Sequence, residues 1–195
     1  MELKQRYNRI LDSVVCIMDA LGLDLTDDSL EKTPHRIAKM FTQEVFGGLF
    51  EERPRMMAVS NKFYYDQMLT VSKIEFSSMC EHHFMPFLGY VHIAYILDGR
   101  VLGLSKFNRL VKWCARRPQV QERLTEMICT ELKEILATDD VAVCCDALHT
   151  CVRARGVEDS HSITRTTALG GVFRSSAEVR GEFLTAIPTT DGFRL

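Results

Sequence analysis

Cysteine and histidine gather in two short clusters of this sequence, Cys80-Glu-His-His83 and His149-Thr-Cys151. Thiolates and imidazoles are the side chains that zinc prefers, and a catalytic zinc site keeps three protein ligands and a fourth position for water. The two clusters offer such a set of three, with two further histidines beside it. Each residue alone is more readily explained as a core or surface residue, so only the combination predicts a metal centre.

Residues 141–153 predict the strand that carries the second cluster, because they are rich in apolar and β-branched side chains and contain no Pro or Gly. Side chains alternate along a strand, so His149 and Cys151 are expected on one face, shared by Arg153 and Arg155 if the strand continues. That face would present a metal ligand, an imidazole for proton transfer and two cations. The alternative interpretation is a buried core thiol beside a structural histidine.

Further cations stand near two expected helix starts, where Lys106 and Arg109 follow Ser105, and Arg36 and Lys39 follow a proline. Cations there oppose the helix dipole by roughly 0.3–1 kcal/mol each, and a bound phosphate would reverse that cost. Together with the two arginines after Cys151, they could converge on one oligoanion, or they could be scattered solvated charges. No P-loop and no G-x-G-x-x-G sequence is present, so side chains would have to hold a triphosphate.

Gln121 and Glu122 lie in the first turn of a helix expected to start at Pro118. A carboxylate accepts two parallel N–H donors, which guanine offers along its N1–H and 2-amino edge and adenine does not. The structural alternative is a carboxylate stabilised by the helix dipole.

The composition is typical of a globular protein: the chain has 195 residues, 46% of them hydrophobic and 26% charged, and a formal net charge of -2. That charge gives no global case for nucleic-acid binding, and no apolar run approaches the roughly 18 residues that span a bilayer. Seven cysteines, an odd number, without a secretory signal indicate reduced thiols and a cytoplasmic protein.

The order of expected elements indicates an α+β fold, an antiparallel sheet with helices on one face. We expect an N-terminal helical arm over residues 1–48 and a catalytic domain over 49–195. The first elements are helices over 3–21 and 34–46, the latter with Thr33 as N-cap, and strands over 71–78 and 87–97 separated by a loop over residues 80–86. An Asp98-Gly99 turn follows the second strand, and helices start at 104 and 118. Strands over 141–153 and 163–173 come next, and a Ser175–Glu178 capping box opens a last helix to about 186.

Six longer motifs make the chain resemble the GTP cyclohydrolase I family over about residues 20–186. They are Cys80-Glu-His-His83, Gly103-Leu-Ser-Lys106, Arg117-Pro-Gln-Val-Gln-Glu-Arg-Leu124, His149-Thr-Cys-Val-Arg-Ala-Arg-Gly156, Thr33-Pro-His-Arg-Ile-Ala-Lys-Met40 and Gly170-Gly-Val-Phe173. The resemblance implies the tunnelling fold, an antiparallel four-stranded sheet with two helices on one face. It also implies a homodecamer of two pentameric rings, with active sites between subunits.

The reaction implied is the conversion of GTP and water to 7,8-dihydroneopterin triphosphate and formate, the entry step to tetrahydrofolate and related pterins. Zinc would lower the pKa of a water molecule for attack on guanine C8, and His149 would be the general acid, with His82 and Ser105 near the ribose. The resemblance implies zinc ligands at Cys80, His83 and Cys151, a guanine contact at Glu122 and Gln121, and a triphosphate clamp of Arg36, Lys39, Lys106, Arg109 and Arg155.

Other interpretations stay open at this point. A nitrile reductase of the same fold would need a nucleophilic cysteine and a nicotinamide cofactor. A zinc-stabilised interaction protein would close all four ligand positions and would not need His149. A zinc deaminase is disfavoured because no P-C-x-x-C follows the histidines, and Fe(II) or Mn(II) could replace zinc.

Overall fold

The computed structural model describes residues 2–97 and 99–188, and the chain divides into two compact units, residues 1–51 and 52–195. In the N-terminal unit α1 (Leu3–Ala20) packs against α2 (Thr33–Lys39), which continues into the π-helical η1 (Met40–Val45) and the 3-10 turn η2 (Gly47–Leu49). Val14 and Met18 are the buried residues of α1, in agreement with its predicted helical spacing. Among the described residues, no helix is both long and apolar enough to cross a membrane.

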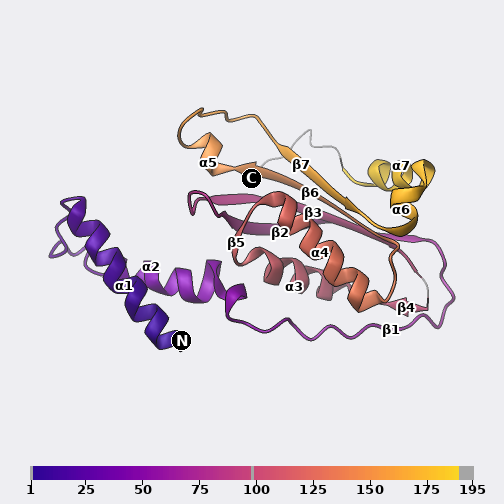
Figure 1. The fold of residues 1–195 in the computed structure, drawn as a ribbon, viewed down its shortest axis with the longest axis horizontal. Helices are drawn as coiled ribbons and strands as arrows, with labels where there is room; N and C mark the ends of the chain where they lie inside the picture. The colour runs from indigo at the N-terminus through magenta and orange to yellow at the C-terminus, as the bar shows by residue number, and fades with distance from the viewer. Residues whose placement is uncertain (1, 98, 189–195) are drawn as a thin grey trace. The chain divides into compact units, whose positions relative to one another are not determined.

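Four long strands form the antiparallel sheet of the second unit (Figure 1). Their order is β2 (Met68–Cys80), β3 (Pro86–Ile96), β6 (Val141–His149) and β7 (Thr164–Leu169). A two-residue strand, β5 (Pro118–Gln119), pairs in parallel with Met79 and Cys80 at the end of β2. A separate ladder joins β1 (Val59–Ser60) to β4 (Arg100–Val101).

The two long helices of this unit, α3 (Leu104–Ala115) and α4 (Gln121–Leu136), pack on one face of the sheet (Figure 1). Every second residue of β6 enters the core beneath them, as strand alternation requires. Short helices α6 (Gly171–Ser175) and α7 (Ala177–Ala186) bury Phe173 and Phe183 against Ala142 and Cys144, which alternate with those core positions. The α+β class is therefore confirmed, and α6 and α7 add a layer that the prediction lacked.

Gly89 sets how closely β3 approaches β6. A Cβ built at this position would lie 1.9 Å from the carbonyl oxygen of Asp146, so only glycine fits without moving the backbone. The same ladder pairs Phe87 with His149 at the end of β6. The close strand pairing thereby determines which residue lies beside the histidine.

The predicted strand over 141–153 is wrong beyond His149. Thr150–Arg153 forms a single helical turn, α5, and the shared face expected for Cys151, Arg153 and Arg155 does not exist. The partner strand explains the break: β3 begins at Pro86, which has no N–H for the ladder, and its carbonyl oxygen accepts the Thr150 hydroxyl at 2.5 Å.

The starts of two predicted helices also shift. Thr33 is the first helical residue and not the cap, which is Lys32. The helix expected at Pro118 begins at Gln121, because Pro118 pairs with β2.

The last helix is capped by Ser176, whose Oγ accepts the Val179 N–H at 3.3 Å, and not by Ser175. The Ser175 hydroxyl is engaged instead at the end of α6, where it donates to the Gly171 carbonyl at 3.3 Å. In the expected Asp98-Gly99 turn, Asp98 lies outside the described residues and Gly99 has a left-handed φ of 67°.

Candidate active site

The three predicted metal ligands lie together at the end of β2 and in α5. The donor atoms of Cys80, His83 and Cys151 are all within 4.8 Å of one another. Two backbone hydrogen bonds close the turn that carries the first two, from the Phe84 N–H to the Cys80 carbonyl and from the Cys80 N–H to the Met85 carbonyl, both 2.8 Å. Residues far apart in the sequence thus form one compact donor group.

The chemistry of this group fits a divalent metal such as zinc. Burial raises the pKa of the Cys151 thiol, and the neighbouring Cys80 raises it further through a hydrogen bond and through charge repulsion. Two thiolates so close together are unfavourable without a cation, and a metal bound between them would favour their deprotonation. Two sulfurs and one imidazole are also the donor types that zinc selects.

His149, the last residue of β6, has its ring held from two sides. The ring stacks on Phe87 with centroids 4.8 Å apart and an interplanar angle of 1°, and its Nε2 lies 2.8 Å from Oε1 of Gln121. Burial lowers the pKa of His149, and the charge of Glu122 opposes that shift. The sequence predicted this imidazole beside a metal ligand, but its stacking partner was missed.

The start of α4 presents two polar side chains with different surroundings. Gln121 is buried, and its Nε2 donates to the carbonyl oxygens of Cys145 and Thr164, both at 2.9 Å. Glu122 is exposed in the first helical turn, where the helix dipole stabilises a carboxylate. Of these two, only the side chain of Glu122 is available to an incoming ligand.

An ion pair links α4 to the metal-ligand turn, the turn over residues 80–85 that carries Cys80 and His83. Arg123 bonds to the carboxylate of Glu81, and its Nε donates to Oε1 of Gln119 at 3.0 Å. The Glu81 N–H donates in turn to the Gln119 carbonyl at 3.0 Å. Sequence reasoning missed this link, although Glu81 stands between two candidate ligands and Arg123 follows Glu122.

The segment just before β5 is held by an aromatic contact. The guanidinium of Arg117 lies 4.4 Å from the ring centroid of Trp113 on α3 and donates to its carbonyl oxygen at 3.0 Å. Because Pro118 then pairs with β2, this contact supports the strand that ends in Cys80.

The predicted cations and small polar residues occupy three places. Arg155 reaches the metal group, with Nη1 2.9 Å from Nε2 of His83. Lys106 in the first turn of α3 bonds through Nζ to the carbonyl of Met57. The remaining members are exposed: His82 in the turn, with Nδ1 3.8 Å from the Cys80 sulfur, Ser105 and Arg109 on α3, and Arg36 and Lys39 on α2 of the N-terminal unit.

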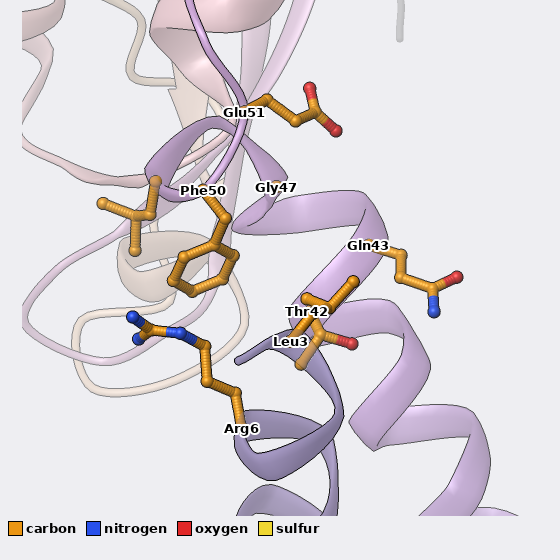
Figure 2. Close-up of a pocket in the computed structure, with 8 residues that line it drawn as sticks. Leu3, Arg6, Thr42, Gln43, Gly47, Phe50 and Glu51 are labelled. Carbon is orange, nitrogen blue, oxygen red and sulfur yellow. The ribbon is translucent and has the colours of Figure 1, made fainter. Parts of the chain in front are cut away.

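A separate pocket of about 500 Å³ lies within the N-terminal unit (Figure 2). The guanidinium of Arg6 stands 4.5 Å from the ring centroid of Phe50 at this pocket. None of the predicted site residues lines it; its walls are Leu3, Arg6, Thr42, Gln43, Gly47, Leu49, Phe50 and Glu51.

Comparison with known proteins decides the family. The model of the GTP cyclohydrolase I family matches residues 10–188, nearly the whole chain. The chain belongs to the GTP cyclohydrolase I family. It is similar to the GTP cyclohydrolase 1 of Aeromonas salmonicida (strain A449), with 52% identity over 182 residues, covering 93% of this chain and 84% of the relative.

Two further relatives of the same name give the same result. The protein of Serratia proteamaculans (strain 568) is 50% identical over 183 residues, covering 93% of this chain and 83% of its own length. That of Citrobacter koseri (strain ATCC BAA-895 / CDC 4225-83 / SGSC4696) is 50% identical over 188 residues, covering 96% and 85%. The prediction of a GTP cyclohydrolase I enzyme is thereby confirmed against the nitrile reductase and the inactive interaction protein.

Proposed function

We propose that the protein converts GTP and water to 7,8-dihydroneopterin triphosphate and formate, the first step of tetrahydrofolate and pterin synthesis, using zinc held by Cys80, His83 and Cys151. The observation that carries this proposal is the donor group of these three side chains in a chain of this family. When bound, the zinc ion would supply Lewis acidity, which lowers the pKa of water toward neutrality.

Glu122 is the residue proposed to select guanine. Its exposed carboxylate can accept hydrogen bonds from N1–H and the 2-amino group together. The charge of Glu122 also acts on His149, so a base held by this carboxylate would lie close to the imidazole. This arrangement favours a purine whose reacting ring faces the metal group.

His149 is the proposed general acid. Opening of the imidazole ring breaks a C–N bond at C8, and the departing purine nitrogen needs a proton that an imidazole can deliver near neutral pH. A second water then releases formate from the formamide. His82 and Ser105, both exposed, are the proposed groups for the later proton transfers as the ribose opens and the pterin ring closes.

The triphosphate is proposed to bind Arg36, Lys39, Lys106, Arg109 and Arg155. In this arrangement Lys106 would exchange the neutral Met57 carbonyl for a negatively charged phosphate oxygen, which is the stronger acceptor for an ammonium group. Residues 49–195 would form the catalytic domain, with the tunnelling fold, and residues 1–48 its helical arm. Ten subunits would assemble into a homodecamer of two pentameric rings with active sites between subunits, and no nucleic-acid or membrane partner is proposed.

The test is incubation of metal-loaded protein with GTP, followed by oxidation and detection of a fluorescent pterin and of formate. Equal amounts of both products are expected. Metal-loaded, folded protein that binds GTP and releases neither product would contradict the proposal. NADPH consumption with a nitrile substrate would point to the reductase instead.

A further inference from the structure

The amide of Gln121 can adopt only one orientation in this fold. Its Nε2 lies 2.9 Å from the carbonyl oxygens of both Cys145 and Thr164, and a carbonyl only accepts hydrogen bonds. The amino end must therefore face them. The other end, Oε1, faces Nε2 of His149 at 2.8 Å.

This orientation decides where His149 carries its hydrogen. An amide oxygen cannot donate, so the 2.8 Å contact is a hydrogen bond only if Nε2 of His149 is the donor. In the neutral ring Nδ1 is then the nitrogen without hydrogen. The stacking on Phe87, which is fully buried, fixes the plane of the ring as well.

We propose that Gln121 is a positioning residue that holds His149 as the Nε2–H tautomer and leaves Nδ1 as the nitrogen that exchanges a proton with the substrate. This inference rests on the proposed function, because it assigns an atom to the proton transfer assigned to His149 above. It also gives the two neighbouring residues different roles. Gln121 would position the general acid His149, and Glu122 would bind the guanine of the nucleotide.

A purely structural role is the competing explanation, because Gln121 also connects α4 to β6 and β7. The next turn of α4 provides a matched comparison. Thr125 is buried there, donates to the Gln121 carbonyl at 2.8 Å and contacts the Thr166 hydroxyl at 2.7 Å, also joining α4 to β7. The contact with Thr166 crosses to β7, whereas the bond to the Gln121 carbonyl stays within α4. Thr125→Val therefore weakens the connection without removing a bond of the Gln121 side-chain amide.

The experiment is a double-mutant cycle on the metal-loaded full chain, with Gln121→Met in the wild-type and in the His149→Ala backgrounds. Contacting residues that act as one unit give non-additive effects. We expect Gln121→Met to lower kcat by about tenfold or more with KM for GTP changed less than about twofold. In the His149→Ala background the same change should alter kcat by less than about twofold.

A second variant protects the test against a folding defect. Thr125→Val, which weakens the contact of α4 with β7 and leaves the Gln121 amide in place, should leave kcat unchanged. Equal losses of kcat in both backgrounds, a change confined to KM, or a loss of kcat for Thr125→Val as large as that for Gln121→Met would overturn the inference. A wild-type protein that forms no pterin would instead overturn the proposed function.

Discussion

The imidazole ring of His149 is held in one position and has a lowered pKa. Stacking on Phe87 and the hydrogen bond to Gln121 limit the ring to one place, and burial lowers its pKa. The unfolded chain binds this proton more readily than the folded protein. The contribution of His149 to the free energy of unfolding is therefore present above pH 6.5, the ordinary histidine pKa, and is lost as the pH falls from there through the lowered pKa.

Replacing His149 by Ala should remove turnover without removing the metal. A general acid of this kind contributes about 10²–10⁴-fold, while Cys80, His83 and Cys151 stay in place. Metal analysis and single-turnover assays on one preparation measure both effects. Loss of metal from the His149→Ala variant would indicate that His149 is itself a metal ligand or positions one of the ligands. Unchanged rates would move the proton transfer elsewhere, with His82 the next candidate.

Replacing Cys151 by Ser should cost metal and activity together, because a serine hydroxyl is a much poorer zinc ligand than a thiolate. Cys16→Ser is the matched control, since Cys16 is an exposed thiol of the N-terminal unit. Metal content and pterin formation are measured for both proteins. Full turnover by metal-free Cys151→Ser protein would refute a catalytic metal at this site.

Removing the Glu122 carboxylate should weaken use of GTP. The loss of an acceptor for two guanine donors is expected to cost on the order of 2–4 kcal/mol in kcat/KM. Glu126→Ala, at an exposed position of the same helix, should change kcat/KM little. Initial rates at limiting GTP give the comparison, and equal rates for Glu122→Ala and wild type would rule out this role.

At the scale of elements, the types of side chain predict the group of metal-donor atoms well. The strand geometry inferred from the sequence, in contrast, does not predict where β6 ends. The residue types of Cys80, His83 and Cys151 are sufficient to predict a donor group, and the fold brings those atoms together. The strand parity expected to align Cys151 with Arg155 fails, because β6 ends where its partner begins. Sequence periodicity describes one element, whereas the end of a strand depends on its neighbour in the sheet.

The link between Glu81 and Arg123 could not be predicted for a similar reason. It requires β5 to pair in parallel with the last residues of β2, and two residues carry no periodic signal. The motif that contains Gln121 predicts this residue at the substrate. Its buried amide can be recognised only from the pairing of β6 and β7 beside α4.

The pairing of β6 with β7 brings together the buried Asp146 and the exposed Arg165 in an ion pair that makes stability depend on pH. Burial by itself raises the pKa of Asp146, but bidentate bonds from Arg165 at 2.6 and 2.7 Å, with His92, outweigh it, so the net pKa is lowered. This contribution is present above the ordinary carboxyl pKa of 3.8 and is lost as the pH falls through the lowered value.

Arg165→Met should therefore destabilise the fold at neutral pH, by up to about 3–5 kcal/mol, because it leaves the buried Asp146 with His92 but without its bidentate partner. Because the Arg165 side chain is 37% exposed and water screens its charge, the loss of unfolding free energy should lie near or below the lower value of that range. The difference from wild type should narrow in acid, as Asp146 becomes protonated. Urea unfolding across pH measures it, with the exposed Arg174→Met as control; a difference independent of pH would exclude Asp146 as its source.

At the scale of the whole molecule, exposed apolar side chains on α1 suit a larger assembly. Ile17 is 58% exposed and Leu21, which follows the helix, is 69% exposed. Burying such residues between subunits would stabilise them in an oligomer. A decamer, with active sites completed by neighbours, is the assembly proposed above.

Sedimentation at sub-micromolar concentration should show a particle of decameric mass, with activity in the same fractions. Ile17→Asp should dissociate it partly if α1 lies between subunits, whereas a change at the exposed Glu134 on α4 should not. An active monomer would contradict both the decamer and the shared active site.

Trp113 is the only tryptophan of the sequence, and it lies against Arg117 just before the strand that supports Cys80. Its fluorescence therefore comes from one known location in the fold. Emission during unfolding will report the loss of the packing of Trp113 against Arg117 and the core, independently of the tyrosines elsewhere. The unlabelled protein thus contains its own optical probe of the segment beneath the metal-ligand turn.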